Sequence, residues 1–313
     1  MRITDLRTNE IFTSLLPFSC AIALGNFDGV HIGHAELLKK TAQYAKENGC
    51  ESAVFTFDTA PALSLGKSAK TLTPTAKKLE IFKSFGVSYA VLCDFDEIRD
   101  VCAEDFISDI LIKKLHSVCT VCGFNYRFGK GAAGDYLLLE KKMKENGLFS
   151  ITVEPVIYEN ESVSSTRIRK YIESGNIETA NRLLGRYYEK SSKVETGKRI
   201  GRTIGVPTIN QNFDKNEIIP LCGTYASFCR IDGKTYPSVT NVGSKPTVKD
   251  DGVINCETHI INFSGDLYQK TVNVCFLSYM RNERKFASLE ELKAQIGKDI
   301  ERSEELFRKE RPK

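Results

Sequence analysis

The spacing of apolar residues changes along the chain, and this change limits the possible folds. Up to about residue 122, short apolar runs alternate with longer segments in which apolar residues recur at helical spacing. After Gly185 the helical spacing disappears, and short runs rich in β-branched and aromatic residues follow. One period does not describe both parts. The sequence therefore predicts two domains, residues 1–184 and 185–313, with the boundary near residues 183–189.

The first part predicts strands separated by helices. Expected strands cover residues 20–24, 52–57, 89–93 and 118–122, and expected helices cover residues 30–48, 76–82 and 104–115. Strands that alternate with helices favour a doubly wound parallel sheet covered on both faces. Two short helices are expected at residues 166–173 and 177–184, with Gly175 and Gly185 as terminators.

The second part predicts a small antiparallel β-barrel. Its expected strands cover residues 225–229, 236–240, 258–263 and 271–276, and Asp232-Gly233 is a hairpin-turn signal. An amphipathic helix is expected over residues 288–307 and would close the domain.

Composition excludes several classes of function. Net charge is +4 without blocks of like charge, so binding of nucleic acid through bulk charge is not expected. Apolar runs stay well below the roughly 20 residues that span a bilayer. The first residues also lack the layout of a secretion signal. We therefore expect a cytoplasmic protein without a membrane or nucleic-acid partner.

The cysteines are expected to be reduced core thiols. There are ten, scattered through apolar stretches rather than gathered in a short loop-rich framework. Cys119 and Cys122 form the one C-x-x-C pattern. Residues three apart on a strand face opposite sides of a sheet, so core packing is favoured over a metal or redox site.

The connection from the first strand to the first helix, Gly25-Asn-Phe-Asp-Gly-Val-His-Ile-Gly-His34, lies where open α/β sheets bind ligands. The free N–H groups of the helix start favour a phosphate there. His31 and His34 lie on one side of the first helical turn and can donate to phosphoryl oxygens during transfer of an AMP unit. Alternatively, the two histidines only cap the helix. A phosphate-binding site is favoured over capping alone, because Phe27 and Asp28 are accompanied by glycines that allow the backbone to approach a ligand. These glycines are Gly25, Gly29 and Gly33.

Two further segments are expected at the same edge of the sheet. Gly123 ends a strand level with Gly25, so Asn125 and Arg127 are expected to face the nucleotide. In Val163-Ser-Ser-Thr-Arg-Ile-Arg169, Arg169 offers a two-pronged donor to the leaving pyrophosphate. The hydroxyls that precede it hold phosphate or simply cap a helix: Ser164, Ser165 and Thr166.

The second domain opens with a dense glycine-rich and basic stretch, Thr196-Gly-Lys-Arg-Ile-Gly-Arg-Thr-Ile-Gly-Val-Pro-Thr-Ile-Asn210. Thr208 and Asn210 offer hard oxygen donors suited to Mg²⁺. The glycines allow a flap whose N–H groups cover phosphates: Gly197, Gly201 and Gly205. Basic side chains in the same stretch offset phosphate charge: Lys198, Arg199 and Arg202.

Residues 25–34 resemble the G-x-F-D-x-x-H-x-G-H signature of the nucleotidylyltransferase superfamily. Within that superfamily, the residues present are most similar to the bifunctional riboflavin kinase/FAD synthetase family. Gly123-Phe-Asn-Tyr-Arg-Phe-Gly129, followed by Gly134-Asp135, and residues 163–169 are similar to two further motifs of that family. The resemblance implies a Rossmann-like FMN adenylyltransferase domain that uses ATP. It also implies a flavin contact for Arg127 and catalytic roles for His31, His34, Asn125 and Arg169.

Residues 196–210 resemble the G-x-x-x-G-R-x-[LI]-G-x-P-T-x-N motif of the family's riboflavin kinase domain. Gly223-Thr-Tyr225 and Asn241-Val-Gly-Ser-Lys-Pro-Thr247 are similar to two more of its elements. By this resemblance Glu257 is the catalytic base, and Arg281, Glu283 and Phe286 bind the flavin. Two small departures, Ser192 and Val206, remove neither a donor nor a metal ligand.

One departure lies in the first domain, where Phe57-Asp-Thr-Ala-Pro61 stands in place of the family's Phe-x-Pro-His-Pro. The leading hypothesis is two reactions: riboflavin and ATP give FMN, then FMN and ATP give FAD and pyrophosphate. A riboflavin kinase alone, with the first domain kept for nucleotide binding or assembly, is the alternative that the missing histidine suggests. A flavin- or nucleotide-sensing regulator is less supported, because the sequence resembles no DNA-reading helix-turn-helix.

Overall fold

The structure is a computed structural model that describes residues 1–12, 16–58, 70–197, 201, 205–244 and 254–312. These residues form two compact units, Met1–Ser165 and Thr166–Lys313.

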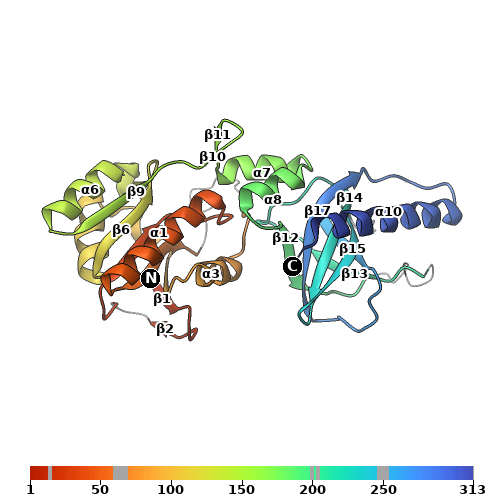
Figure 1. Ribbon diagram of the computed structural model, residues 1–313, viewed down its shortest axis with the longest axis horizontal. Coiled ribbons are helices and arrows are strands. Elements are labelled where there is room, and N and C mark those ends of the chain that lie inside the picture. Colours follow the sequence, from red (N-terminus) through yellow and green to blue (C-terminus); the bar gives the residue numbers. More distant parts are fainter. Residues whose placement is uncertain (13–15, 59–69, 198–200, 202–204, 245–253, 313) are drawn as a thin grey trace. The chain divides into compact units, whose positions relative to one another are not determined.

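The first unit contains a seven-stranded sheet of order β2-β1-β5-β4-β3-β6-β9. Neighbouring strands from β5 to β9 run parallel, whereas β1 is antiparallel to β5 and to β2. All four predicted strands are confirmed. The antiparallel edge strands β1 and β2, labelled in Figure 1, were not predicted. The strands are β1 (Arg2–Asp5), β2 (Ile11–Phe12), β3 (Cys20–Leu24), β4 (Glu51–Phe57), β5 (Tyr89–Cys93), β6 (Ser117–Gly123) and β9 (Phe149–Val153).

Helices cover both faces of this sheet, as a doubly wound fold requires. On one face α1 and α3 supply Leu38 and Phe82 to the core. On the other face η1 and α6 supply Leu111 and Leu139 to a second core. The helices are α1 (Ile32–Asn48), α3 (Thr75–Ser84), α4 (Phe95–Ile98), α5 (Ala103–Asp105), η1 (Phe106–Lys114), η2 (Lys130–Ala132) and α6 (Tyr136–Glu145). Short strand pairs are β7 (Arg127–Phe128) with β8 (Gly134–Asp135) and β10 (Ile157–Tyr158) with β11 (Glu161–Ser162).

The predicted helix over residues 104–115 differs in kind from the observed segment. It consists of the short helix α5 followed by the π-helix η1. In a π-helix each N–H bonds five residues back, and the N–H of Leu115 donates to the carbonyl of Ile110 over 3.0 Å.

The C-x-x-C pair packs as strand alternation predicts. Cys119 lies in one core and Cys122 in the other, on opposite faces of β6. Burial raises the pKa of both thiols to about 12, which disfavours thiolate chemistry. All ten cysteines lie in the described ranges without a disulfide. The expectation of core thiols is wrong for Cys102 and Cys222, which are exposed, because Cys102 caps α5 and Cys222 precedes β14.

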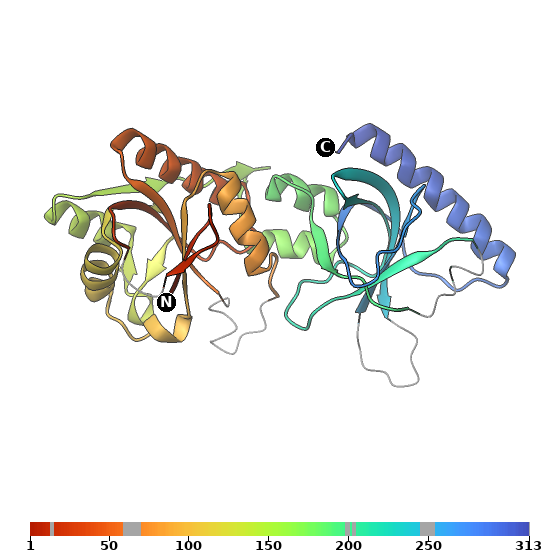
Figure 2. The ribbon, with the colours of Figure 1, turned by 90° about the horizontal axis from the view of Figure 1, so that it is seen from below.

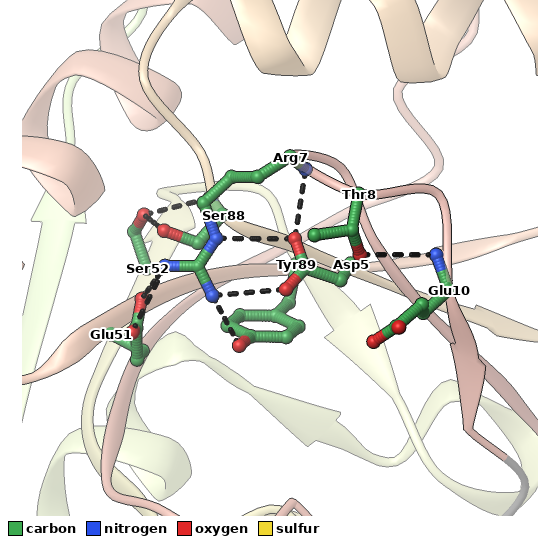
Figure 3. A network of polar contacts seen from close by, with 8 residues as sticks. All are labelled: Asp5, Arg7, Thr8, Glu10, Glu51, Ser52, Ser88 and Tyr89. Atoms are coloured by element: carbon green, nitrogen blue, oxygen red, sulfur yellow. Dashed lines mark hydrogen bonds and ion pairs between the residues drawn. The ribbon is translucent and has the colours of Figure 1, made fainter.

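The antiparallel edge is fixed by a polar network at the amino ends of β4 and β5 (Figure 3). The guanidinium of Arg7 donates to both carboxylate oxygens of Asp5, over 3.1 and 3.0 Å, and also to Glu51 and the hydroxyl of Tyr89. Asp5 and Tyr89 are register partners in β1 and β5. The network thus joins β1 to the parallel strands, at the edge opposite their carboxyl ends.

The second unit contains a six-stranded antiparallel sheet of order β12-β17-β14-β15-β16-β13. A bridge between Glu195 and Asn210 brings the chain after β12 to β13 and nearly closes the predicted barrel. The strands are β12 (Glu189–Lys193), β13 (Thr208–Asn212), β14 (Gly223–Ile231), β15 (Lys234–Ser244), β16 (Ile254–Ile260) and β17 (Thr271–Arg281), with helices α7 (Ser165–Glu173), α8 (Ile177–Leu184) and α10 (Leu289–Glu310).

The ends of these elements follow local chemistry. Asp232 and Gly233 both have positive φ, 48° and 74°, and form the predicted hairpin turn between β14 and β15. The predicted strand over 258–263 is wrong at its end, because β16 stops at Ile260 and Asn262 turns the chain with φ 57°. Ser288 caps α10, which packs along β14 and β15 (Figure 2). Within the described ranges, no helix is both long and apolar enough to cross a membrane.

Candidate functional sites

The first candidate site is the connection between β3 and α1. His31 has an extended backbone and caps α1, because its Nδ1 accepts the N–H of His34 over 3.2 Å. A backbone N–H only donates, so Nδ1 carries no proton, and neutral His31 has its proton on Nε2. The rings of His31 and His34 stack with centroids 3.7 Å apart. His31 therefore caps the helix, and the cap fixes which ring nitrogen can donate; a catalytic role for His31 and His34 stays a prediction.

Residues before His31 shape the connection from inside. Phe27 is fully buried and packs edge-on against Phe82. Asp28 is 3% exposed, and its Oδ1 accepts the N–H groups of Leu72 and Thr73 over 2.9 and 3.3 Å. The side chains of Phe27 and Asp28 therefore support the connection from within.

The glycines of this connection allow it to fold closely on itself. A Cβ at Gly25 would lie 3.1 Å from the ring of Phe27, and one at Gly33 would lie 3.1 Å from Nδ1 of His31. Gly29 has φ 82°, a backbone region that favours glycine. Close packing within the loop is thus a reason for these glycines that the sequence interpretation did not include.

The other predicted adenylyl-site residues are spread over three places. Asn125 is exposed and follows Gly123, the last residue of β6, which pairs with β3 in parallel. Arg127 lies in the β7–β8 ribbon and pairs with Asp135 at 2.9 Å. Ser164 precedes α7, and Ser165 donates its hydroxyl to the carbonyl of Asp28 over 2.7 Å. Thr166 and Arg169 are counted in the second compact unit, so their place beside the histidines remains a prediction.

Sequence reasoning missed Lys78, a lysine on α3 that is only 5% exposed. Its ammonium donates to the carbonyl of Phe57, the last residue of β4, over 2.9 Å. Burial lowers the pKa of Lys78, and the charges of Asp28 and Asp58 act against that shift. The signal was present, since Lys78 stands four residues before buried Phe82 on the expected helix.

The second candidate site is a row of side chains across the sheet of the second unit. Register partners in neighbouring antiparallel strands point to the same face. The row crosses β17, β14, β15, β16 and β13 in the order Arg281, Thr224, Asn241, Glu257 and Asn210. Three residues predicted from separate segments of the sequence, Arg281, Glu257 and Asn210, thus share one face.

Polar side chains that can take part in catalysis or metal binding lie around Glu257. The hydroxyl of Thr208 donates to Oε1 of Glu257 over 2.7 Å. Thr208 and Asn210 are two residues apart on β13, so their side chains share a face. Oδ1 of Asn210 accepts from Asn255 over 2.9 Å, which orients the amide. Asn255 is a further residue that sequence reasoning missed.

The donor set at Thr208 and Asn210 fits a hard cation. It offers a hydroxyl and an amide oxygen beside a carboxylate, the ligands that Mg²⁺ accepts together with water and phosphate oxygens. Among the residues described, no group of three His, Cys, Asp or Glu side chains could hold a metal ion.

Two glycines of the predicted flap, Gly197 and Gly201, lie close to these donors. A Cβ at Gly197 would lie 2.3 Å from Nδ2 of Asn210, and the N–H of Glu195 donates to the carbonyl of Asn210 over 2.8 Å. A Cβ at Gly201 would lie 2.2 Å from the carbonyl oxygen of Val206, and Gly205 has φ 80°. Predicted residues outside the described ranges are Lys198, Arg199 and Arg202.

The predicted flavin residues lie at the other end of the row. Arg281 forms a two-pronged ion pair with Asp299 of α10, at 3.2 and 2.7 Å. Glu283 accepts from Asn241 over 2.9 Å, and a Cβ at Gly243 would lie 2.0 Å from its Oε1. Phe286 is half-buried, with the guanidinium of Arg284 4.6 Å from its ring centroid.

A doubly wound sheet with a histidine-capped loop at its first helix, followed in the chain by a near-barrel with a Thr-Asn-Glu cluster, is typical of a two-domain enzyme that transfers groups from nucleotides. A family model described as FAD synthetase matches residues 16–167, and one described as riboflavin kinase matches residues 184–307.

Relatives of nearly the same length extend this match. Proteins named bifunctional riboflavin kinase/FMN adenylyltransferase are 36% identical in Escherichia coli (strain K12), covering 92% of this chain and 93% of the relative, and 34% identical in Listeria monocytogenes, covering 92% of each. A Streptococcus pneumoniae structure titled macrolide-efflux protein has a TM-score of 0.85 and 30% identity, covering 96% of this chain and 97% of the other. The chain belongs to the bifunctional riboflavin kinase/FMN adenylyltransferase family.

Proposed function

We propose that this chain converts riboflavin to FMN in its second domain and FMN to FAD in its first, with ATP as co-substrate of both reactions. The observation that carries the proposal is the presence of two separate side-chain clusters, each inside the match to its own family model. Because both matches occur and full-length relatives bear the bifunctional name, this function is favoured over a kinase alone. We place the domain limit between residues 184 and 185, next to the start of the riboflavin kinase match, whereas the compact units divide earlier, between Ser165 and Thr166.

In the kinase reaction the terminal ribityl hydroxyl attacks the γ-phosphorus of ATP and must lose its proton. A carboxylate within hydrogen-bond reach can accept that proton as general base. Oε1 of Glu257 accepts from Thr208, so we assign Oε2 as the oxygen that takes the proton. The hydroxyl of Thr208 thereby holds the carboxylate in one orientation while the new P–O bond forms and the bond to ADP breaks.

We propose that Thr208 and Asn210 hold the divalent cation, and that this cation is Mg²⁺. When bound, such an ion neutralises charge on the β- and γ-phosphate oxygens. Two contacts support this assignment: Asn255 orients the amide of Asn210, and Gly197 lies close enough to that amide that a Cβ would not fit. We assign the flap residues Gly197, Lys198, Arg199, Gly201, Arg202 and Gly205 to phosphate binding, and Arg281, Glu283 and Phe286 to the flavin.

In the adenylyl reaction an FMN phosphate oxygen attacks the α-phosphorus of ATP, and pyrophosphate leaves. Donors aimed at the phosphoryl oxygens stabilise the charge that develops there. His31 has its Nε2 proton fixed by the cap and sits at the positive end of α1, which suits this role. We assign His34, Asn125 and Arg169 to the same charge stabilisation. Contacts to ATP are assigned to Gly25, Gly29, Gly33, Ser164, Ser165 and Thr166, and a flavin contact to Arg127. The buried side chains of Phe27 and Asp28 are assigned to support of the loop instead.

Incubation of the purified protein with FMN, ATP and Mg²⁺ tests the adenylyl half of the proposal. FAD and pyrophosphate should appear in equal amounts. If neither FAD nor pyrophosphate appears, while the same protein still forms FMN from riboflavin, the kinase-only alternative is supported. A place in the cytoplasm and the lack of nucleic-acid partners stay predictions from the sequence.

A further inference from the structure

The strongest feature outside the predicted residues is the buried ammonium of Lys78. A lysine that is 5% exposed is uncommon unless its charge is compensated or used. Its side chain does not pair with a neighbour on the helix, but donates to the carbonyl of Phe57 at the carboxyl end of β4. Neighbouring Lys77 behaves as surface lysines usually do: it is more exposed and forms an ion pair with Glu80, three residues along α3, at 3.1 Å.

Lys78 stands at the end of the sheet that carries the adenylyl site. β4 lies beside β3 in parallel, so the carboxyl end of β4 and the start of the β3–α1 connection share one edge. Thr56 at this end donates its hydroxyl to the carbonyl of Asn26 in that connection, over 2.9 Å. The N-terminal turn of α3 is fastened to the same end, because Thr75 donates its hydroxyl to the carbonyl of Asp58 over 3.0 Å.

A second set of bonds ties the same helix to the site. Asp28 of the β3–α1 connection accepts the N–H groups of Leu72 and Thr73, which lead directly into α3. The negative charges of Asp28 and Asp58 raise the pKa of Lys78 and so oppose the effect of its burial. Helix α3 is therefore attached at two points: its start is bonded to Asp28 of the β3–α1 connection, and Lys78 is bonded to the end of β4.

We propose that Lys78 is a positioning residue for adenylyl transfer: its buried positive charge holds Asp28 and the end of β4, and through them sets the loop that carries His31. The residue does not need to touch substrate. Its charge balances the carboxylate of Asp28, which is itself 3% exposed, at a site that must accept the phosphates of ATP and FMN. The inference rests on the function proposed above for the first domain.

The test compares Lys78→Met, Lys78→Gln and Lys78→Arg in the full-length protein, with Lys77→Met as the matched surface control. Gln keeps a donor for the Phe57 carbonyl without the charge, and Arg keeps the charge. Values of kcat and KM for FAD formation are measured per folded molecule, with thermal unfolding and FMN formation recorded for each variant.

We expect Met and Gln to lower the adenylyl kcat about 10- to 100-fold, the size of effect that small misplacement of a reacting group produces. KM for ATP should change by less than about threefold, Arg should restore most of kcat, and Lys77→Met and FMN formation should match wild type. Equal kcat for Gln and wild type, or equal losses for Arg and Met, would overturn the inference. Wild-type protein that forms no FAD would instead overturn the proposed function.

Discussion

The hydroxyl of Thr208 lies 2.7 Å from Oε1 of Glu257 and joins two strands, β13 and β16, at the centre of the kinase cluster. This bond combines the residue proposed to hold the cation with the residue proposed to accept a proton. The hydroxyl of Thr208 thus has two proposed roles, to bind the cation and to orient Glu257. Replacement of Thr208 by valine, its apolar isostere, would remove both.

Thr208→Val should therefore lower kcat for FMN formation by about 10- to 100-fold, the range expected for loss of a hydrogen bond to a charged group. Thr208→Ser keeps the hydroxyl and should retain most of the activity. Initial rates at saturating riboflavin and ATP check this. Equal activities of the Val and Ser variants would contradict the role of the hydroxyl.

Gly197→Ala should reduce FMN formation, because the added Cβ would lie 2.3 Å from Nδ2 of Asn210 and displace that amide or the flap. The expected loss is about tenfold or more, with a higher Mg²⁺ concentration needed for half-maximal rate. Gly297→Ala on α10 is the control, since nothing lies within 4 Å of a Cβ there. A Gly197→Ala variant with wild-type Mg²⁺ dependence would show that close approach is not required.

His31 allows capping and catalysis to be separated. His31→Ala removes the cap of α1 and should cost about 1 kcal/mol of unfolding free energy together with about 10²-fold in adenylyl rate. His31→Asn restores a good cap, so it should recover the stability and leave the rate low. Urea unfolding and FAD formation are measured side by side. Recovery of the rate by Asn would mean that His31 serves only as a cap.

The network around Arg7 predicts an acid-sensitive first domain. The hydrogen bonds from Arg7 hold the pKa of Asp5 below its usual range. A group with a depressed folded pKa stabilises the native state above its unfolded pKa, about 3.9, and that contribution is lost as pH falls through the lower folded value. Asp5→Asn should therefore destabilise the domain at pH 6 and show a shallower loss of unfolding free energy below pH 4. Asp100→Asn, at an exposed aspartate, should follow wild type. Parallel pH profiles for wild type and Asp5→Asn would contradict this linkage.

Much of the fold follows from periodicity and terminators. The ends of β3, β5 and α8 match the predictions, and Gly49 and Gly185 both end helices in the left-handed region. The predictions missed β1 and β2, whose short runs at the antiparallel edge carry little periodic signal. That edge depends on Arg7 reaching Glu51 and Tyr89, contacts between residues distant in sequence.

The site residues also fall into two groups, those that motifs predict and those that only contacts in the structure reveal. Thr208, Asn210 and Glu257 could be chosen from motifs, and sheet register places them together. Asn255 and Lys78 could not be chosen so readily, because their importance comes from what they contact. Phe27 and Asp28 stand in a ligand-binding motif, yet their side chains point into the protein and support the loop. A motif identifies a site, but does not separate residues that touch substrate from those that shape the loop.

Chromatography of the flavins that single-site variants form from riboflavin tests whether two independent sites act one after the other. His31→Asn should convert riboflavin to FMN at the wild-type rate and accumulate FMN. Glu257→Gln should form neither product from riboflavin, yet should make FAD at the wild-type rate when FMN is supplied. A folded variant in which either substitution abolishes both reactions would contradict the account.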